Sequence, residues 1–255
     1  MTAKSAIAQM AFSIKMGENH IYDFPEKYRA AVERMVRVLP TEEIKELSEK
    51  VTKAQGTLNP AQWEKEYSSK TPHWATDMKP SQFAKEFADD VKERGLGSIL
   101  EIGCGNGRDS IHFAKSGFIV QAIDVSKSAV KLAQRNIKKA KVDVSIRVAS
   151  AEDLPFPDYN FDAVFSLSVL HSTNLQKSLR EIFRVMAGRG IAFIYIYGDT
   201  QFENGTKEII ITLDNFVALL KEIGFIISDF YSEQEKEFDE YGEKHQLLIT
   251  YMEKM

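Results

Sequence analysis

One short segment, Ser98 to Ser110, constrains the fold more than any other part of the chain, because it reads as a strand, a glycine-rich turn and a helix start. Its sequence is SILEIGCGNGRDS. The first residues are apolar and partly β-branched, which is typical of a buried strand that ends near Glu101. The glycines that follow permit positive φ angles and a close approach of the backbone to a ligand, and the helix expected from Arg108 presents unpaired N–H groups. The segment therefore predicts a ligand-cradling unit.

The spacing of these glycines indicates the kind of ligand. Gly103, Gly105 and Gly107 form G-x-G-x-G, whereas the dinucleotide fingerprint is G-x-G-x-x-G. Glu101 stands two residues before the first glycine, where a carboxylate repels a pyrophosphate but suits a ligand that carries an ammonium group. An ordinary strand–helix turn without a ligand is the alternative for this segment alone.

Composition and charge narrow the class of protein. The chain has 255 residues and a net charge of −4, which fits one α/β domain with or without a small extension and disfavours a general nucleic-acid or anionic-membrane surface. The single cysteine, Cys104, permits neither an internal disulfide nor a cysteine metal cluster, and we expect it to pack under the turn rather than act as a reactive thiol. Apolar runs are far shorter than the roughly 20 residues of a membrane span, and the N-terminus lacks the apolar core of a signal peptide. We therefore expect a cytoplasmic protein.

Helical and strand patterns divide the chain into two parts. Residues 1–60 carry helical apolar spacing interrupted at Pro40 and Gly56, which predicts a helical N-terminal extension; its use as a lid, a partner surface or extra packing is open. Residues 61–255 alternate strands and helices, which predicts an α/β domain with a Rossmann-like, doubly wound, seven-stranded and mostly parallel sheet whose last strand is antiparallel. We expect its strands at residues 99–102, 118–123, 142–148, 161–166, 191–197, 225–230 and 247–251.

In a sheet of this kind the ligand binds beyond the carboxyl ends of the strands, so the residues that follow each strand are candidates. Asp124 follows the second strand, about 20 residues after the glycines, where a carboxylate accepts two ribose hydroxyls. Capping of the next helix is the alternative, but Ser126 suits that role. Ser150 to Glu152 follow the third strand and are expected along an adenine edge. The segment after the fourth strand is expected at the reacting end of the ligand, with Leu167, Ser168 and His171.

Four of these segments together resemble the class I S-adenosylmethionine (SAM) dependent methyltransferases of the type 11/25-like group. They are EIGCGNG, AIDVS, AEDLPFPDYNFD and SVLH, and the likeness extends from about Pro80 to Phe230. It implies that SAM is the cofactor and S-adenosylhomocysteine the product. By position, the glycines lie under the methionine part with Glu101 near its ammonium group, Asp124 holds the ribose, and Val125 flanks the adenine. The implied cofactor-contacting set is Glu101, Gly103, Cys104, Gly105, Gly107, Asp124, Val125, Ser150, Ala151, Glu152, Leu167 and Ser168, although Ser150 stands where the family often has an acid.

A narrower likeness concerns the aromatic residues before the first strand. WEKEY, PHW and a late GEKH are similar to the thiopurine and tellurite-resistance branch of methyltransferases, in which small, soft nucleophiles are methylated. Trp63, Tyr67 and Trp74 either pack the N-terminal extension on the domain or form an aromatic wall, to which a sulfonium cation is attracted. With His171 and Tyr197 they are the candidates on the acceptor side.

The resemblance implies methyl transfer to a small-molecule acceptor by in-line displacement, in which the protein mainly aligns the reactants and excludes water. A general base is needed only for an acceptor that is protonated at neutral pH; His171 is the candidate, and a structural histidine is the alternative. Ser166 to Val169 read SLSV and lack the N/D-P-P-Y/F motif of enzymes that methylate nucleic-acid bases. We therefore expect no nucleic acid, membrane or metal as a partner. We expect the protein to be a monomer or a homodimer.

Two other functions stay open on the sequence. A SAM-binding regulatory or partner protein without methyl transfer is consistent with the large N-terminal extension and with the lack of an obvious base. An NAD-dependent oxidoreductase is disfavoured by the glycine spacing between Gly103 and Gly107. The sequence names neither the acceptor nor the atom that is methylated.

Overall fold

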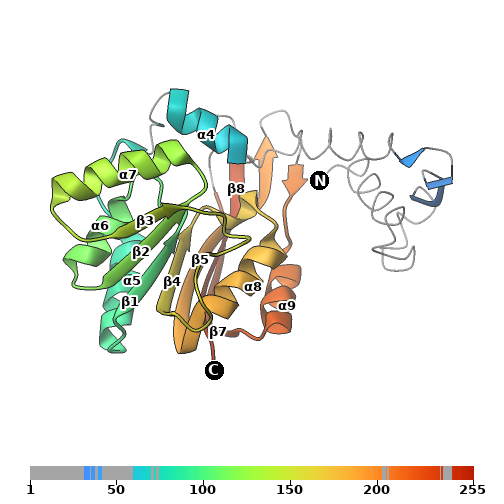
Figure 1. Cartoon of the computed structure of the whole chain (residues 1–255). Coiled ribbons are helices and arrows are strands. Elements are labelled where there is room, and N and C mark those ends of the chain that lie inside the picture. Colours follow the sequence, from blue (N-terminus) through green and yellow to red (C-terminus); the bar gives the residue numbers. More distant parts are fainter. Residues whose placement is uncertain are drawn as a thin grey trace. The chain divides into compact units, whose positions relative to one another are not determined.

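The computed structural model describes residues 32–34, 36–37, 40–41, 60–69, 72, 75–202, 205, 207–235, 237 and 243–255. The chain separates into two compact units, residues 1–56 with 200–210 and residues 57–199 with 211–255. The helical extension that we expected over residues 1–60 lies largely outside the described residues, so its helices and its boundary stay predictions. Figure 1 labels the larger helices and strands of the domain that contains the sheet.

The strands form one sheet in the order β3-β2-β1-β4-β5-β8-β7, and β6 pairs with β5 outside this path. The five strands β1 to β5 pair in parallel, and β7 and β8 pair antiparallel. Seven mostly parallel strands therefore lie along the path, which confirms the Rossmann-like, doubly wound α/β fold; the short β6 was not expected. The bounds are β1 Ser98–Ile102, β2 Ile119–Asp124, β3 Ser145–Val148, β4 Phe161–Leu167, β5 Met186–Phe202, β6 Lys207–Ile209, β7 Ile226–Gln234 and β8 Glu243–Glu253.

Side-chain caps fix where several helices begin. The hydroxyl of Ser81 accepts from Ala84 N at the start of α5, that of Ser126 accepts from Ala129 N at the start of α7, and Thr212 caps α9 in the same way. Ser126 thus takes the capping role expected from the sequence. The described helices are α4 Pro60–Ser69, α5 Gln82–Glu93, α6 Arg108–Lys115, α7 Lys127–Ala140, the 3₁₀ helix η3 Leu170–Ser172, α8 Leu175–Val185 and α9 Leu213–Ile223.

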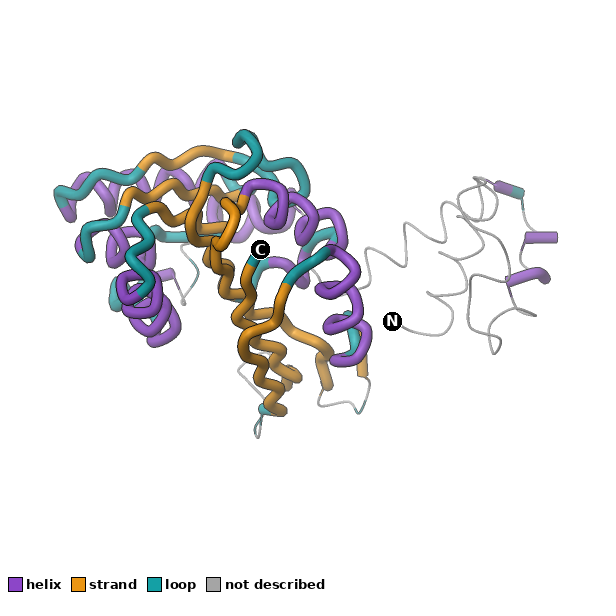
Figure 2. Tube along the Cα trace, turned by 90° about the horizontal axis from the view of Figure 1, so that it is seen from below, coloured by secondary structure: helices purple, strands orange, loops and turns teal. Residues whose placement is uncertain are grey.

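Two apolar clusters, one on each face of the sheet, form the core. One joins α5, α6 and α7 to the sheet, the other joins α8 and α9 to it, and Figure 2 shows helices along both sides of the strands. Phe165 of β4 and Phe193 of β5 are register partners whose rings stack with centroids 5.0 Å apart, and Phe87 of α5 and Phe113 of α6 contact Phe165. Among the described helices, none is both long and apolar enough to cross a membrane.

Four strands differ clearly from the lengths expected: β3 is shorter, and β5, β7 and β8 are longer. β3 begins only at Ser145, because Lys141 takes a left-handed conformation (φ 56°) at the end of α7 and residues 142–144 return the chain to the sheet. β5 begins at Met186 and passes through the glycines that were expected to separate it from the preceding helix. The C-terminal residues supply the partners for this extension, since Arg189 N donates to Lys254 O (2.7 Å) and Lys254 N donates to Gly190 O (3.0 Å).

Phe165→Ala should lower the free energy of unfolding by about 3–5 kcal/mol, because it removes a fully buried ring and leaves a cavity among Phe87, Phe113 and Phe193. Urea unfolding followed by circular dichroism measures the change. Ile119→Ala truncates a side chain that is 72% exposed, and as the control it should change the value by less than about 0.5 kcal/mol. Equal effects of the two variants would contradict this description of the core.

Candidate functional site

The glycine turn after β1 has the backbone conformation that its sequence requires. Gly103, Gly105 and Gly107 have φ angles of 73°, 52° and 79°. A Cβ atom on Gly103 would overlap the methyl groups of Val169, and one on Gly105 would lie 2.7 Å from the Tyr67 hydroxyl. The turn is therefore a cradle that only glycine fits, enclosed by the segment after β4 on one side and by α4 on the other.

Asp124, at the end of β2, ties this turn to the start of α7. Its Oδ2 accepts a hydrogen bond from Gly105 N and its Oδ1 accepts one from Ser126 N, each at 2.9 Å. Burial raises the pKa of the carboxyl, and the two N–H donors oppose that shift. A carboxylate has about four lone-pair sites, so these two bonds leave acceptor capacity for a ligand. The structure thus brings Asp124 and the glycine turn together, as expected, and Val125 follows at half-buried exposure.

Glu101 is a buried carboxyl beneath the turn. Ser110 Oγ donates a hydrogen bond to it, and burial, followed by the negative charge of Asp109, raises its pKa well above the usual value. Asp109 in turn accepts a hydrogen bond from Ser81 N (2.7 Å) and lies 3.6 Å from the Arg108 guanidinium. A positively charged ligand group would relieve the cost of ionising Glu101.

Cys104 packs in the apolar cluster that contains α5 and α6. Burial, and then the charge of Glu101, raise the pKa of its thiol well above the usual value, so the reactive thiolate is disfavoured. The packing role expected from the sequence is supported over the reactive one. In the described part of the chain, no group of three or more His, Cys, Asp or Glu side chains lies close enough to hold a metal ion.

The helix α4 contributes a residue that the sequence analysis missed. Glu64 Oε2 accepts hydrogen bonds from Ser126 Oγ (2.8 Å) and Ser128 N (3.0 Å), and its Oε1 accepts one from Ser128 Oγ (2.8 Å). These bonds, the Ser128 N–H first, lower the pKa of Glu64 to about 2. Nothing in the local sequence signals this role, because the partners lie 62 and 64 residues away. Trp63 is half-buried on the same helix, and Trp74 lies outside the described residues.

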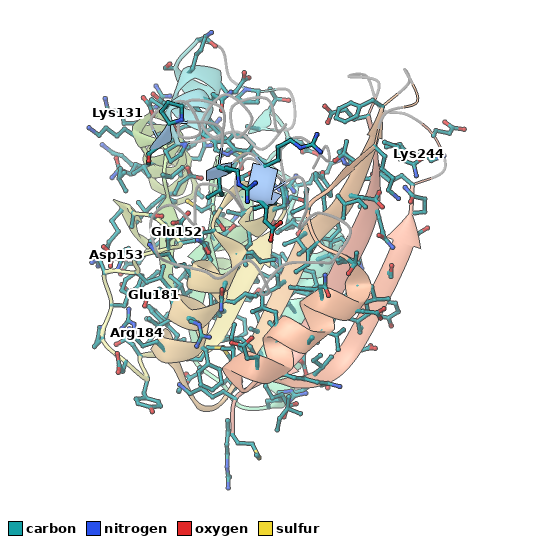
Figure 3. The ribbon with its side chains drawn as sticks, turned by 90° about the vertical axis from the view of Figure 1, so that its right-hand side faces the viewer. Lys131, Glu152, Asp153, Glu181, Arg184 and Lys244 are labelled. Atoms are coloured by element: carbon teal, nitrogen blue, oxygen red, sulfur yellow. The ribbon has the colours of Figure 1, made fainter. Side chains whose placement is uncertain are left out.

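The segment after β3 is fixed by α8. Ser150 Oγ accepts from Glu152 N (3.1 Å), and Glu152 Oε1 accepts from Asn174 N (2.9 Å) at the start of α8, while Ala151 is buried. Figure 3 labels Glu152 beside Asp153, with Glu181 and Arg184 farther along the same side. Glu181 Oε2 accepts from the backbone N–H of residue 154, and Arg184 Nη2 donates to the carbonyl of the same residue. These hydrogen bonds tie the candidate residues after β3 to α8.

The segment after β4 leads into a stack of three rings. Leu167 ends β4, and Ser168, with φ 56°, donates its N–H to Tyr195 O. The His171 and Tyr197 rings stack at 4.4 Å between centroids, and the Tyr197 and His245 rings at 3.9 Å.

Burial, and then the charge of His245, lower the pKa of His171 to about 3, and its buried Nδ1 has no hydrogen-bond partner among the described residues. A base is most effective when its pKa lies near the operating pH, so this environment favours the structural alternative for His171. The catalytic role of His171 stays a prediction.

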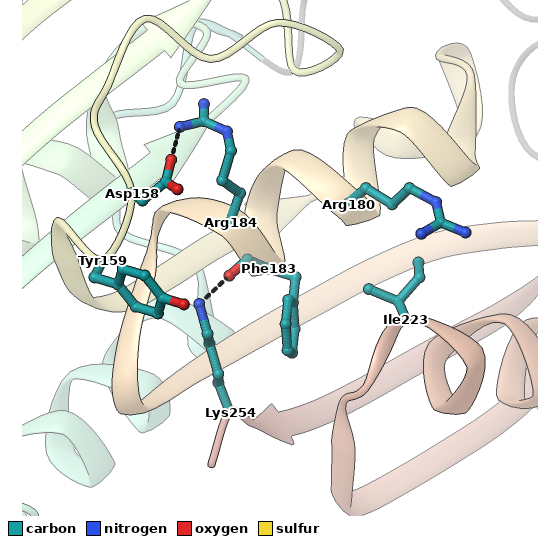
Figure 4. A pocket seen from close by; sticks show the side chains of 7 residues that line it. All are labelled: Asp158, Tyr159, Arg180, Phe183, Arg184, Ile223 and Lys254. Carbon is teal, nitrogen blue, oxygen red and sulfur yellow. Dashed lines mark hydrogen bonds and ion pairs between the residues drawn. The ribbon is translucent and has the colours of Figure 1, made fainter.

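A separate cavity of about 280 Å³ lies at the opposite end of the parallel strands (Figure 4). Tyr159 precedes β4, Arg184 stands near the end of α8, and Lys254 follows β8, which places the cavity away from the glycine turn. Its cations are paired: Arg184 with Asp158 at 2.8 Å, and Lys254 Nζ with the carbonyls of Phe183 and Met186 at 2.6 and 2.8 Å. These contacts are those of a structural clamp on the end of α8.

Comparison with known proteins finds methyltransferases among the proteins that this chain resembles. Residues 100–194 match a family model described as a methyltransferase domain. The protein named "Putative methyltransferase YrhH" from Bacillus subtilis is 35% identical over 131 residues, which are 50% of this chain and 67% of that protein. The 27-O-demethylrifamycin SV methyltransferase of Amycolatopsis mediterranei is 30% identical over 143 residues, which are 49% of this chain and 53% of that protein.

Solved structures extend the likeness to the fold. The structure of "a putative sarcosine dimethylglycine methyltransferase" from Galdieria sulphuraria superposes with a TM-score of 0.56 at 16% identity, and the match covers 68% of this chain and 85% of that one. The chain spans about half the length of the first curated relatives that it matches. The residues matched by the family model include the glycine turn, Asp124, Ser150 to Glu152 and Leu167 to His171.

Glu101→Gln should stabilise the ligand-free protein increasingly as the pH rises above about 4.5, the ordinary pKa of a glutamate. The folded protein keeps the Glu101 proton to a higher pH than the unfolded chain does. The stability that this proton confers is complete below pH 4.5 and is lost as the pH rises through the raised pKa, by up to about 1.4 kcal/mol per pH unit. The glutamine side chain has no proton to lose in this pH range, so the variant keeps its stability as the pH rises.

Urea unfolding of wild type and Glu101→Gln between pH 5 and 8 tests this prediction. The difference between their free energies of unfolding should widen as the pH rises. Glu93→Gln is the control, since that side chain is exposed near the end of α5, and its difference from wild type should not depend on pH. Parallel profiles for wild type and Glu101→Gln would contradict the burial of a protonated carboxyl.

Proposed function

This chain belongs to the class I SAM-dependent methyltransferase family, and from that premise we propose that it transfers a methyl group from SAM to a small-molecule acceptor and releases S-adenosylhomocysteine. The observation that carries the proposal is the glycine turn with positive φ angles, bonded through Gly105 N to the buried carboxylate of Asp124. This pairing joins a backbone cradle to an acceptor for hydroxyl groups at the carboxyl ends of β1 and β2.

The residues around the turn fit SAM in chemistry as well as in position. Two buried carboxyls, Glu101 and Asp124, suit a ligand that carries an ammonium group and ribose hydroxyls. We propose that the glycines lie under the methionine part, that Asp124 holds the ribose, and that Val125 flanks the adenine. The remaining proposed contacts are Cys104 within the glycine turn, Ser150, Ala151 and Glu152 toward the adenine side, and Leu167 and Ser168 toward the methyl group.

SAM, when bound, supplies a methyl group on a sulfonium, which is already an activated leaving group. The work left to this chain is to align the acceptor in line with the methyl–sulfur bond and to exclude water. We propose that His171 stays neutral at pH 7 and offers a hydrogen-bond acceptor on the acceptor side, beside Tyr197, because the pKa of about 3 makes it a weak base. An acceptor that is nucleophilic without loss of a proton suits this arrangement.

The acceptor itself is proposed to be a small molecule. The name of the Amycolatopsis relative specifies an acceptor of that size, 27-O-demethylrifamycin SV. The net charge of −4 and the SLSV sequence after β4 disfavour nucleic acid. Trp63 and Trp74 stay candidates for the acceptor side, and a cytoplasmic monomer or homodimer stays our expectation.

The alternative is a SAM-binding regulatory or partner protein that transfers no methyl group, and the low pKa of His171 is the observation in its favour. Release of S-adenosylhomocysteine in the presence of a panel of thiol, amine, hydroxyl and metalloid acceptors distinguishes the two functions. We expect turnover with at least one acceptor. Tight binding of S-adenosylhomocysteine without turnover across the panel would favour the regulatory protein.

Asp124→Ala should weaken binding of S-adenosylhomocysteine at least tenfold in isothermal titration calorimetry. Each charge-assisted hydrogen bond to the ribose is worth roughly 1.5–3 kcal/mol, against about 8 kcal/mol for a micromolar ligand. Asp143→Ala removes an exposed carboxylate and should leave the affinity unchanged. A thermal melt confirms that both variants fold, and an unchanged Kd for folded Asp124→Ala would overturn the role of Asp124.

A further inference from the structure

A closed chain of contacts runs from α4 through the glycine turn and Asp124 and back to α4. We call the glycine turn and Asp124 the donor site, because we propose that they bind the methyl donor. Glu64 accepts from the hydroxyl of Ser126, and Ser126 N donates to Asp124. Asp124 accepts from Gly105 N, and a Cβ on Gly105 would meet the hydroxyl of Tyr67. Glu64 and Tyr67 are three residues apart on α4, so they lie on one face of the helix. One helix therefore reaches both the glycine turn and the Asp124 segment.

Polar contacts with α7 contribute to the docking of α4. None of the ten residues of α4 is fully buried, and an isolated helix shorter than about 12–15 residues is marginal in water. The contacts of α4 with the rest of the domain therefore matter to its stability. Glu64 places a carboxylate at the N-terminus of α7, where unpaired N–H groups and the helix dipole favour negative charge.

Ser126 has two roles that make it sensitive to Glu64. Its Oγ accepts from Ala129 N as the cap of α7, while its hydroxyl hydrogen goes to Glu64. Its backbone N–H fixes one oxygen of Asp124. Ser126 therefore stands between Glu64 and the carboxylate that we propose holds the ribose.

We propose that Glu64 is a positioning residue of the donor site, whose carboxylate clamps α4 to the first turn of α7 so that Tyr67 stays over Gly105 and Asp124 stays fixed. Tyr67 is thereby assigned to the donor side rather than to the acceptor side. The inference rests on the proposed function, because it names a residue that supports the same site without touching the ligand. Glu64 acts through Ser126 and Ser128.

The test compares Glu64→Gln with Glu66→Gln in the full chain. Glutamine keeps the size of Glu64 but loses its charge and one acceptor oxygen, whereas Glu66 is an exposed carboxylate on the same helix. Hydrogen–deuterium exchange of residues 61–69 without ligand reports the docking of α4, and calorimetry reports the Kd of S-adenosylhomocysteine. Glu64→Gln should speed the exchange about tenfold or more and raise the Kd about tenfold, and Glu66→Gln should change neither.

Tyr67→Phe gives a second measurement, because it removes the hydroxyl at Gly105 and leaves Glu64 intact. It should also raise the Kd, and the double variant should lose less than the product of the two single effects, since both act through the docked helix. Unchanged exchange in Glu64→Gln would overturn the clamp. Faster exchange with an unchanged Kd would overturn its role in the donor site.

The two proposals fail separately. If the wild-type protein does not bind S-adenosylhomocysteine, the proposed function is overturned. The exchange comparison uses no ligand, so it still decides whether Glu64 holds α4 on α7.

Discussion

Asp124 accepts one hydrogen bond from Gly105 and one from Ser126, so a single carboxylate joins the ends of β1 and β2 to the start of α7. The position of β2 beside β1 puts Asp124 next to the glycine turn, and the cap at Ser126 fixes where α7 begins. Each partner of Asp124 is a backbone N–H. The carboxylate is therefore oriented by the backbone of the glycine turn and by the backbone at the cap of α7.

Burial of the Glu101 and Asp124 carboxyls costs free energy, and the hydrogen bonds of the ligand-free protein offset that cost only in part. Glu101 has the hydroxyl of Ser110, and Asp124 has two N–H groups, yet the pKa of each carboxyl is raised because burial outweighs these bonds. Such conflicts with local stability are expected at functional sites. The charge of the ligand decides whether this cost falls or rises. A cationic ligand with hydroxyl groups lowers the cost of burying the two carboxylates, and an anionic ligand raises it.

Local patterns explain which features the sequence predicted. The glycine spacing, the acid after β2 and the cap at Ser126 are read from adjacent residues, and the structure has each where it was expected. Glu64 was missed because its partners are more than 60 residues away, and the extension of β5 was missed because Lys254 supplies its partners from the other end of the chain. Long-range pairing of polar groups leaves no periodic signal in the sequence.

The two ends of the sheet differ in how some of their polar groups are paired. At the amino ends of the parallel strands, the charged groups of Arg184 and Lys254 are matched by Asp158 and by backbone carbonyls. Near the carboxyl ends, Ser166 Oγ and His171 Nδ1 are buried without a hydrogen-bond partner among the described residues. An unpaired buried polar group costs about 1–3 kcal/mol, so a fold keeps it where a ligand can complete the pairing. Both groups lie in β4 or in the segment after it, beside the strand that carries the glycine turn, where we propose that the acceptor binds.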